Sequence, residues 1–290
     1  MTVVLSPNPY RDKGLRAVQS ARQILEGCGV ETLLCLPFTL EENSRVELPR
    51  HLNFIPLKEG LTKADILVCF GGDGTILHAA KDANACNVPI LGVNMGSVGF
   101  MAELENGELA QLSKLAQGKY TLENRMMLDV KVARNGRVIF QDVALNDAVV
   151  TKGAVARVID LAVYGDKVLI SELAGDGVIL STPTGSTGYA MSAGGPIVEP
   201  TAENIIFTPI CAHSLHAKSV VLGPERLISV RLGRDSRKSA YLSVDGGRAF
   251  KLVPGDRVEV SKSPNQTRLV KLTGRSFYEI LNQKLGGDKL

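Results

Sequence analysis

Residues 64–75 read ADILVCFGGDGT, an apolar run that ends in a glycine-rich turn. Such a continuous apolar run indicates a strand that is buried on both faces of a parallel sheet. A second run, VPILGV, follows at residues 88–93, and residues 75–83 between the two runs have the pattern of a crossover helix. The stretch therefore predicts a strand, a glycine turn, a helix and a second strand, which is the repeating unit of an α/β fold.

The rest of the first ~120 residues keeps this alternation of short apolar runs and helical patterns. Residues 2–5 predict a strand, and residues 15–28 predict a helix that ends at a glycine. Leucines at 104, 109, 112 and 115 predict a further helix over residues 104–115. This half is therefore expected to be a parallel sheet covered by helices.

From Leu128 onward the pattern changes to strands and tight turns. Asn135-Gly136 and Gly165-Asp166 each separate two apolar runs, which predicts two hairpins. Further strands are expected without a helical period among them: VILST, NIIFTPI, SVVLG, RLISVRL, AYLSV and DRVEVSK. A last helix over residues 276–284 is expected to pack back on the first domain, because its apolar face needs a surface to cover.

Length and composition narrow the class of protein. The chain has 290 residues, 44% hydrophobic and 22% charged, with a mean hydropathy of +0.08, which suggests about two globular domains and excludes a disordered chain. The net charge of +3 and the absence of Trp argue against nucleic-acid binding. With no apolar run long enough for a bilayer and no signal peptide pattern, a cytoplasmic location is expected. The five cysteines form no CxxC pair, so neither disulfides nor a zinc site are predicted.

The glycine turn after the buried strand carries the most informative chemistry. Gly71, Gly72 and Gly74 let the backbone approach a ligand, and their N–H groups suit phosphate oxygens, with Thr75 as the N-cap of the next helix. A carboxylate beside phosphate is unfavourable unless a cation or a donated proton offsets it. Asp73 is therefore a candidate general base for a hydroxyl or a candidate metal ligand. The alternative is that Asp73 only caps the helix.

Two more glycine-rich segments follow. Residues 94–100, NMGSVGF, also come after an apolar strand, so they are expected at the same edge of the sheet as the GGDGT turn. Residues 175–196 are dense in Gly, Ser and Thr, which suits a sugar or phosphate ligand, with a long surface loop as the alternative. Walker P-loops, the GxGxxG fingerprint, HExxH motifs and the GxSxG elbow are all absent from the sequence.

Several of these segments together resemble the NAD kinase family. The segments are GGDGT at 71–75, NMGSVGF at 94–100, LND at 145–147, GDGVILSTPTGSTGY at 175–189 with SAGGP behind it, and FTPICAHSL at 207–215. GGDGT alone is shared with diacylglycerol kinases, sphingosine kinases and phosphofructokinases, whereas the STPTGSTGY block is much more specific. The resemblance implies ATP-dependent transfer of phosphate to the 2′-hydroxyl of the adenosine ribose of NAD, giving NADP.

The resemblance also implies the domains. It implies an N-terminal Rossmann-like α/β domain over residues 1–123, with residues 274–290 packing back on it, and an all-β dinucleotide-binding domain over residues 124–273. The site is expected in the cleft between the two domains.

Site residues follow from the same resemblance. Asp73 matches the aspartate that activates the 2′-hydroxyl, and Gly74 and His78 match positions near the nucleotide. The positions that match dinucleotide contacts in the all-β domain are Asn146, Asp147, Arg157, Ala174, Asp176, Thr187, Gly188, Tyr189, Ser192 and Gly247. The family usually has Glu at Asp147, which implies a longer or water-mediated hydrogen bond here, and Ala at Gly188, which implies a looser loop.

Cofactor and partners are implied in the same way. The resemblance implies ATP as the phosphoryl donor, with polyphosphate and other donors left open, and Mg²⁺ or another divalent cation. It implies a homodimer or homotetramer without a nucleic-acid or membrane partner. Two alternatives are a lipid kinase, which the STPTGSTGY block disfavours, and a dinucleotide sensor without catalysis, which the intact Asp73 disfavours.

Overall fold

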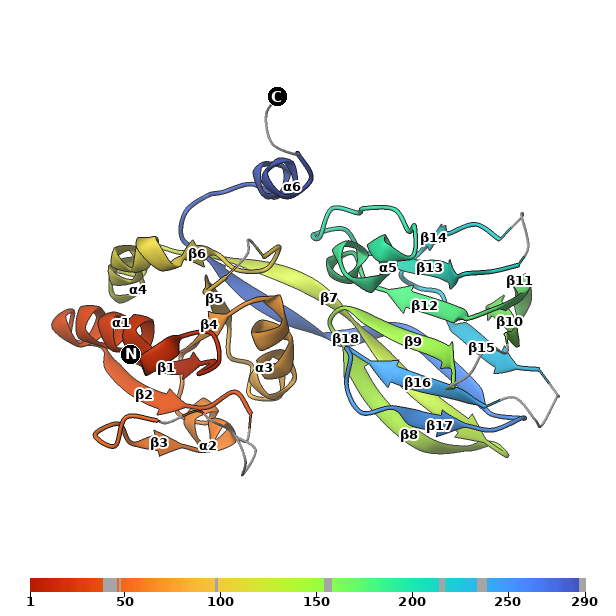
Figure 1. The fold of residues 1–290 in the computed structure, drawn as a ribbon, viewed down its shortest axis with the longest axis horizontal. Coiled ribbons are helices and arrows are strands. Elements are labelled where there is room, and N and C mark those ends of the chain that lie inside the picture. The colour runs from red at the N-terminus through yellow and green to blue at the C-terminus, as the bar shows by residue number, and fades with distance from the viewer. Residues whose placement is uncertain are drawn as a thin grey trace. The chain divides into compact units, whose positions relative to one another are not determined.

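The computed structural model describes residues 1–38, 46, 48–96, 99–153, 158–213, 217–233 and 239–286. The chain divides into two compact units, Met1–Asn124 with Thr267–Leu290, and Arg125–Gln266. Two long strands, β7 (Thr121–Arg134) and β18 (Arg257–Lys271), contribute residues to both units (Figure 1). The expected fold class is confirmed: an α/β unit, an all-β unit, and a C-terminal helix that returns to the first unit.

The first unit is a parallel sheet with helices on both faces (Figure 1). Its elements are β1 (Thr2–Pro7), the 3₁₀ helix η1 (Lys13–Leu15), α1 (Arg16–Gly27), β2 (Glu31–Cys35), β3 (Phe54–Ile55), α2 (Leu57–Leu61), β4 (Ile66–Gly71), α3 (Asp73–Ala85), β5 (Ile90–Asn94), β6 (Leu104–Glu105), the 3₁₀ helix η2 (Asn106–Leu112), α4 (Ser113–Ala116) and α6 (Phe277–Leu285). The strands are hydrogen-bonded in the order β5-β4-β1-β2-β3. Val3 and Leu5 share a core with Val18 of α1, while Val4 and Gly92 on the opposite face meet α2 and α3.

The second unit consists of antiparallel sheets that share one apolar core. Its remaining elements are β8 (Arg137–Ala144), β9 (Asp147–Lys152), β10 (Ile159–Gly165), β11 (Val168–Gly175), β12 (Gly177–Ser181), the 3₁₀ helix η3 (Thr184–Thr187), α5 (Tyr189–Ser192), β13 (Ile205–Ile210), β14 (Val220–Leu222), β15 (Ile228–Leu232), β16 (Ala240–Val244) and β17 (Phe250–Leu252). One sheet has the order β14-β13-β12-β9-β16-β17. The strands that pack against it are hydrogen-bonded in the order β11-β10-β15-β18, and β7 pairs with both β18 and β8. Val150, Leu180 and Phe207 of the first sheet pack with Val163 and Val230. Among the described residues, none of the helices is both long and apolar enough to cross a membrane.

Residues 104–115 are not the single helix that the leucine spacing predicted. Leu104 pairs with Val93 as the short strand β6, and Asn106-Gly107 then begins a 3₁₀ helix that α4 continues. Leu109, Leu112 and Leu115 are buried as expected. The prediction of one helix was wrong because the first leucine is used in the sheet.

The two hairpins were predicted with different success. Asn135 and Gly136 have φ values of +50° and +77°, so the first turn is confirmed. The second turn lies one residue later than expected, at Asp166 and Lys167, because Gly165 is still paired with Val168. The Asp166 carboxylate accepts hydrogen bonds from Leu227 N–H (3.0 Å) and the Arg226 guanidinium (2.8 Å), which fixes the turn at that residue.

Residues 175–196 contain regular secondary structure and are not one long loop. They form β12, the 3₁₀ helix η3 and the four-residue helix α5, and the two helices contradict the expectation that this half contains none. Each helix is shorter than the window in which a helical period becomes visible. At the C-terminus, α6 is confirmed, and Ser276 and Glu279 form a capping box at its start.

Candidate functional site

The GGDGT turn joins β4 to α3 within the first unit. Gly71 ends the strand, and a Cβ there would lie 2.1 Å from Thr75 Oγ1, so the turn requires glycine. Gly72 is the N-cap, and Thr75 lies inside the helix, where its hydroxyl accepts a hydrogen bond from Asn8 Nδ2 (3.2 Å). The prediction of Thr75 as N-cap was wrong because the helix begins two residues earlier, at Asp73.

Asp73 is held by the second glycine-rich segment. Its carboxylate accepts hydrogen bonds from the N–H groups of Phe100 (2.8 Å) and Met101 (3.1 Å). A Cβ on Gly99 would lie 2.2 Å from Asp73 Oδ1, so glycine is required for this approach. Asp73 therefore does not cap α3, and the expectation that the two segments meet at one edge of the sheet is confirmed.

A cavity of about 180 Å³ opens beside the turn. It is lined by Asn8, Arg11, Gly72, Gly74, Thr75, Asn94 and Gly96. Backbone of the glycine turn and the Arg11 guanidinium are groups that bind phosphate oxygens. Sequence reasoning missed Arg11, although its position just after β1, a parallel strand ending at the same edge, is a usable signal.

His78 lies on α3, four residues after Gly74, and is exposed. Its ring centroid is 6.1 Å from that of Phe38, which in turn stacks on Tyr10 with a centroid distance of 6.0 Å. His78 thus lies on the helix that begins with Asp73 and contacts an aromatic pair, Tyr10 and Phe38, from the segments after β1 and β2.

In the second unit, the predicted Asn146-Asp147 pair is anchored by a residue that sequence reasoning missed. The carboxylate of Asp245 accepts hydrogen bonds from the N–H groups of Leu145 (2.7 Å), Asn146 (2.8 Å) and Asp147 (3.0 Å). Asp245 has a φ of +49° and begins the turn that contains Gly247, whose N–H donates to Val244 O (2.8 Å). The predicted Gly247 therefore lies in the turn that supports Asn146 and Asp147.

Asp147 is buried, with 5% of its surface exposed. Burial, and secondarily the negative charge of Asp245, raise the pKa of Asp147 from its ordinary 3.8 to about 7. Burial also raises the pKa of Asp245, against the lowering effect of the three backbone N–H groups. The carboxyl of Asp147 thus changes its charge near neutral pH.

We expect this carboxyl to make stability fall as the pH rises. The folded chain keeps a proton on Asp147 between pH 3.8 and about 7, whereas the unfolded chain releases it, so the stabilisation is present at low pH and lost toward pH 7. Asp147→Asn removes this dependence. The melting temperature of the variant minus that of the wild type should be roughly 5–10 °C larger at pH 8.5 than at pH 5. This follows from ~1.4 kcal/mol of stability per unit of pKa shift. Calorimetry at both pH values checks this. Asp160→Asn, at an exposed carboxyl, is the control, and a pH-independent difference for Asp147→Asn would contradict the prediction.

Asn146 is packed against the segment after β12. Its carbonyl oxygen accepts a hydrogen bond from Thr182 N–H (2.9 Å), and a Cβ on Gly185 would lie 2.1 Å from that oxygen. A Cβ on Gly188 would lie 3.6 Å from Asn146 Nδ2 and 3.3 Å from Gly185 O, so the glycine leaves room beside the amide. Among the described residues, Asn146 Oδ1 is a buried acceptor without a hydrogen-bond partner. An acceptor left open in this way suits a ligand donor.

Three more predicted residues lie on η3 and α5. Thr187 donates its hydroxyl to Thr184 O (3.2 Å). Tyr189 is 46% exposed, and Ser192, one turn further along α5, is also exposed. The structure thus places an exposed aromatic ring and an exposed hydroxyl on the helix that follows the Asn146-binding segment.

Asp176 sits in a glycine-flanked turn between β11 and β12. Its carboxylate forms an ion pair with Lys152 Nζ (2.6 Å), a partner that the sequence did not suggest. A Cβ on Gly177 would lie 2.2 Å from Val150 O, which explains the glycine after the aspartate. Ala174, near the end of β11 and two residues before Asp176, accepts a hydrogen bond on its carbonyl oxygen from His213 N–H (2.9 Å). Arg157 lies outside the described residues, as do Ser97, Val98 and residues 214–216 of the motifs.

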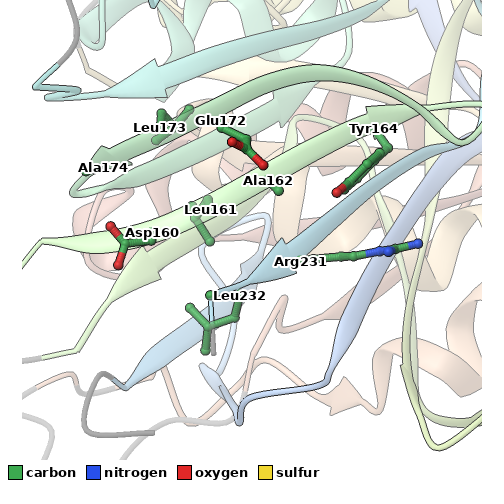
Figure 2. Close-up of a pocket in the computed structure, with 10 residues that line it drawn as sticks. Asp160, Leu161, Ala162, Tyr164, Glu172, Leu173, Ala174, Arg231 and Leu232 are labelled. Carbon is green, nitrogen blue, oxygen red and sulfur yellow. The ribbon is translucent and has the colours of Figure 1, made fainter. Parts of the chain in front are cut away.

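A separate hollow of about 540 Å³ lies over β10, β11 and β15. Figure 2 shows Tyr164 and Arg231 on neighbouring strands, with the guanidinium 4.6 Å from the ring centroid. Of the predicted site residues that the structure describes, Ala174 is the one that lines this hollow. The hollow is therefore distinct from the Asn146 and Asp245 group.

Comparison with known proteins agrees with the motifs. The family models described as ATP-NAD kinase N-terminal domain and ATP-NAD kinase C-terminal domain match residues 52–120 and 145–272. An NAD kinase of Symbiobacterium thermophilum is 44% identical over 226 residues, covering 78% of this chain and 80% of the relative. An NAD kinase of Acetivibrio thermocellus is 34% identical over 286 residues, covering 98% and 97%.

Solved structures give the same result. Yeast NADH kinase in complex with NADH has a TM-score of 0.84 at 25% identity, covering 100% of this chain and 89% of that one. An NAD kinase from Archaeoglobus fulgidus in complex with ATP has a TM-score of 0.74 at 27% identity, covering 99% and 98%. With both domain models matched and relatives aligned over nearly the whole length, the chain belongs to the NAD kinase family.

Proposed function

We propose that this chain transfers the γ-phosphoryl group of ATP to the 2′-hydroxyl of the adenosine ribose of NAD, giving NADP and ADP. The observation that carries the chemistry is the Asp73 carboxylate. Two backbone N–H groups hold it at the start of α3, beside a cavity lined by glycine backbone and Arg11. The similar proteins are NAD kinases, and two solved structures among them contain NADH or ATP. These relatives support NAD and ATP as the substrates and phosphoryl transfer as the reaction.

In the proposed reaction Asp73 is the general base. As the ribose oxygen bonds to the γ-phosphorus and the bond to the β-phosphate oxygen breaks, the hydroxyl proton passes to the Asp73 carboxylate. A ribose hydroxyl is a weak nucleophile near neutral pH, and positioned proton removal is worth roughly 10²–10⁴-fold. Arg11 and the N–H groups of Gly72 and Gly74 stabilise the phosphate charge, the main requirement of phosphoryl transfer.

A divalent cation fits the residues present. Among the described residues no three His, Cys, Asp or Glu side chains converge, whereas Mg²⁺ commonly takes one or two carboxylates and completes its shell with substrate phosphates and water. The phosphates of ATP would hold the cation, with Asp73 as the candidate protein ligand, and the cation would neutralise phosphate charge.

On the second unit we assign the NAD contacts by residue. Asn146 offers its open Oδ1 acceptor, and Tyr189 and Ser192 offer an exposed ring and hydroxyl. Asp147 and Asp176 supply carboxyls. The further proposed contacts on this unit are Arg157, Ala174, Thr187, Gly188 and Gly247, and Gly74 and His78 are proposed contacts on the first unit.

The direct test is NADP formation from NAD, ATP and Mg²⁺, coupled to an NADP-specific dehydrogenase. We expect metal-dependent product. Product formed from polyphosphate but not from ATP would show that polyphosphate is the phosphoryl donor. Phosphorylation of NADH would show that the enzyme accepts NADH as well as NAD. NAD binding by calorimetry without NADP from any of these donors would overturn the proposal in favour of a dinucleotide sensor.

The space at Gly99 gives a second test of the Asp73 site. Gly99→Ala places a methyl group where Asp73 Oδ1 now lies, so the carboxylate must move. A displacement of ~1 Å at a reacting group costs roughly 10²-fold, and we expect kcat to fall by that order. Gly27→Ala, at an exposed position of α1 outside the cavity, is the matched control, since no atom would lie within 4 Å of its Cβ. Equal kcat values for the two variants would contradict the role of Gly99.

We further propose a cytoplasmic homodimer or homotetramer. Light scattering coupled to size-exclusion chromatography tests the oligomer, and a monomeric mass for the active enzyme would overturn that part of the proposal.

A further inference from the structure

The C-terminal helix α6 packs on the residue whose backbone holds Asp73. The Phe277 ring lies 6.2 Å from the Phe100 ring, and Lys284 Nζ lies 4.3 Å from the centroid of Phe100. Phe277 and Lys284 are seven residues apart, which is two helical turns, so they lie on one face of α6. The side chain of Phe100 is therefore engaged by this face, and only 8% of the residue is exposed.

The backbone of the same short segment faces the other way, toward α3. Phe100 N–H donates to Asp73 Oδ2 at 2.8 Å, and Met101 N–H donates to Oδ1 at 3.1 Å. The Asp73 carboxylate occupies the space that a side chain at residue 99 would need, since a Cβ on Gly99 would lie 2.2 Å from Oδ1. The rotamer of Asp73 is thus set by where residues 99–101 lie.

The start of α6 is tied to the continuation of that segment. Glu103, two residues after Met101, accepts hydrogen bonds from Leu272 N–H (2.8 Å) and Thr273 N–H (2.7 Å), and it forms a buried ion pair with Lys271. Arg275, just before α6, bonds to Glu108 (2.9 Å). These contacts hold the segment before α6 against residues 103–108, and so fix the start of α6 near Phe100.

We propose that α6 is a positioning element for the phosphoryl-transfer base, acting through Phe277 and Lys284 on Phe100, and through the Phe100 and Met101 N–H groups on Asp73. The helix touches no reacting atom in this scheme. Its catalytic part rests on the proposed role of Asp73, whereas its structural part does not.

A nine-residue helix is marginal in isolation, so α6 keeps its place through these tertiary contacts. Removing the Phe277 ring takes away the aromatic partner of Phe100 and leaves a void beside it. Residues 99–101 then gain freedom, and the two hydrogen bonds to Asp73 open more often. The expected consequence is a lower kcat with unchanged substrate affinity, because the substrate contacts assigned above lie outside α6.

The test compares Phe277→Ala with Leu285→Ala, which shortens an exposed side chain of the same helix. For Phe277→Ala we expect kcat to fall about 10-fold, with the KM values for NAD and ATP within about two-fold. We expect amide hydrogen exchange of Phe100 and Met101, resolved by NMR on the full chain, to speed up about 10-fold or more. Leu285→Ala should change neither quantity, and Phe277→Leu should restore most of both.

Other outcomes overturn the proposal. Unchanged exchange at Phe100 and Met101 in Phe277→Ala excludes the structural link. Faster exchange with unchanged kcat excludes the catalytic part. If Phe277→Ala does not fold, Lys284→Met, which removes only the charge over the Phe100 ring, is measured instead and should show the same changes more weakly.

The same data separate this proposal from the proposed function. Asp73→Ala removes the acceptor, so it should speed exchange at Phe100 and Met101 whether or not the chain is an NAD kinase. Absence of NADP formation by the wild-type enzyme would refute the function, while the exchange measurements would still decide the link between α6 and Asp73.

Discussion

Asp73→Asn reduces the rate of NADP formation by roughly 10³-fold, the range expected when a positioned general base is removed. The amide cannot take the proton of the ribose hydroxyl. It can still accept one of the two backbone hydrogen bonds from Phe100 and Met101, so the turn keeps its place. NAD affinity should stay within several-fold, because the dinucleotide contacts that we assign lie largely on the second unit. Steady-state kinetics and calorimetric titration with NAD measure the two effects separately.

The matched control is Asp82→Asn, at a carboxylate on the same helix that pairs with Lys58 at the surface (3.7 Å). It should retain wild-type kcat. Turnover by Asp73→Asn at a rate near that of Asp82→Asn would eliminate Asp73 as the base. Loss of both turnover and NAD affinity, together with a lower melting temperature, would show that Asp73 supports the fold instead.

Asp245→Ala is expected to cause the largest loss of stability. Three backbone N–H groups lose a buried, charged acceptor, and each unsatisfied buried donor costs ~1–3 kcal/mol. Water that enters the space and relief of the repulsion with Asp147 offset part of this. We expect a net loss of about 3 kcal/mol, or a melting temperature roughly 6–12 °C lower by calorimetry.

The same change should weaken NAD binding. The carboxylate of Asp245 fixes the backbone of Asn146 and Asp147, which we assign to the dinucleotide, so we expect the KM for NAD to rise at least about 10-fold. Asp245→Asn retains an acceptor oxygen and should fall between Asp245→Ala and wild type in both respects.

Asp166→Ala is the control for Asp245→Ala. Asp166 also has a positive φ, +47°, and also accepts a backbone hydrogen bond, from Leu227, but it is exposed. The conformational cost of placing Ala in that region is therefore common to the two variants. They differ in burial and in the number of backbone donors that lose their acceptor, which is three for Asp245 and one for Asp166. A loss of stability as large in Asp166→Ala as in Asp245→Ala would contradict the argument from buried donors.

Much of the fold was predictable because local sequence patterns specify it. The apolar runs at 64–70 and 88–93 became the buried strands β4 and β5, since a strand covered on both faces needs apolar residues throughout. Asn135-Gly136 formed its hairpin because both residues accept a positive φ. The glycine-rich motifs could also be recognised, because positions where another group lies too close for a Cβ require glycine.

Other features depended on residues far apart in the chain. Asp73 is held by N–H groups 27 and 28 residues away, and Leu145 by Asp245 from 100 residues away, and no local pattern specifies either pair. Leu104 entered the sheet instead of a helix because Val93 offered it a strand partner. The second hairpin turned at Asp166 because Arg226 and Leu227 bind that carboxylate.

The sequence by itself therefore determined most of the strands, the Asn135-Gly136 hairpin, the fold class and the family, because propensity and glycine placement act over a few residues. The tertiary structure alone decided which N–H groups orient Asp73, that Asp245 supports Asn146 and Asp147, and that α6 reaches Phe100. It also decided that the pKa of Asp147 rises to about 7, since burial and a neighbouring charge exist only once the chain has folded.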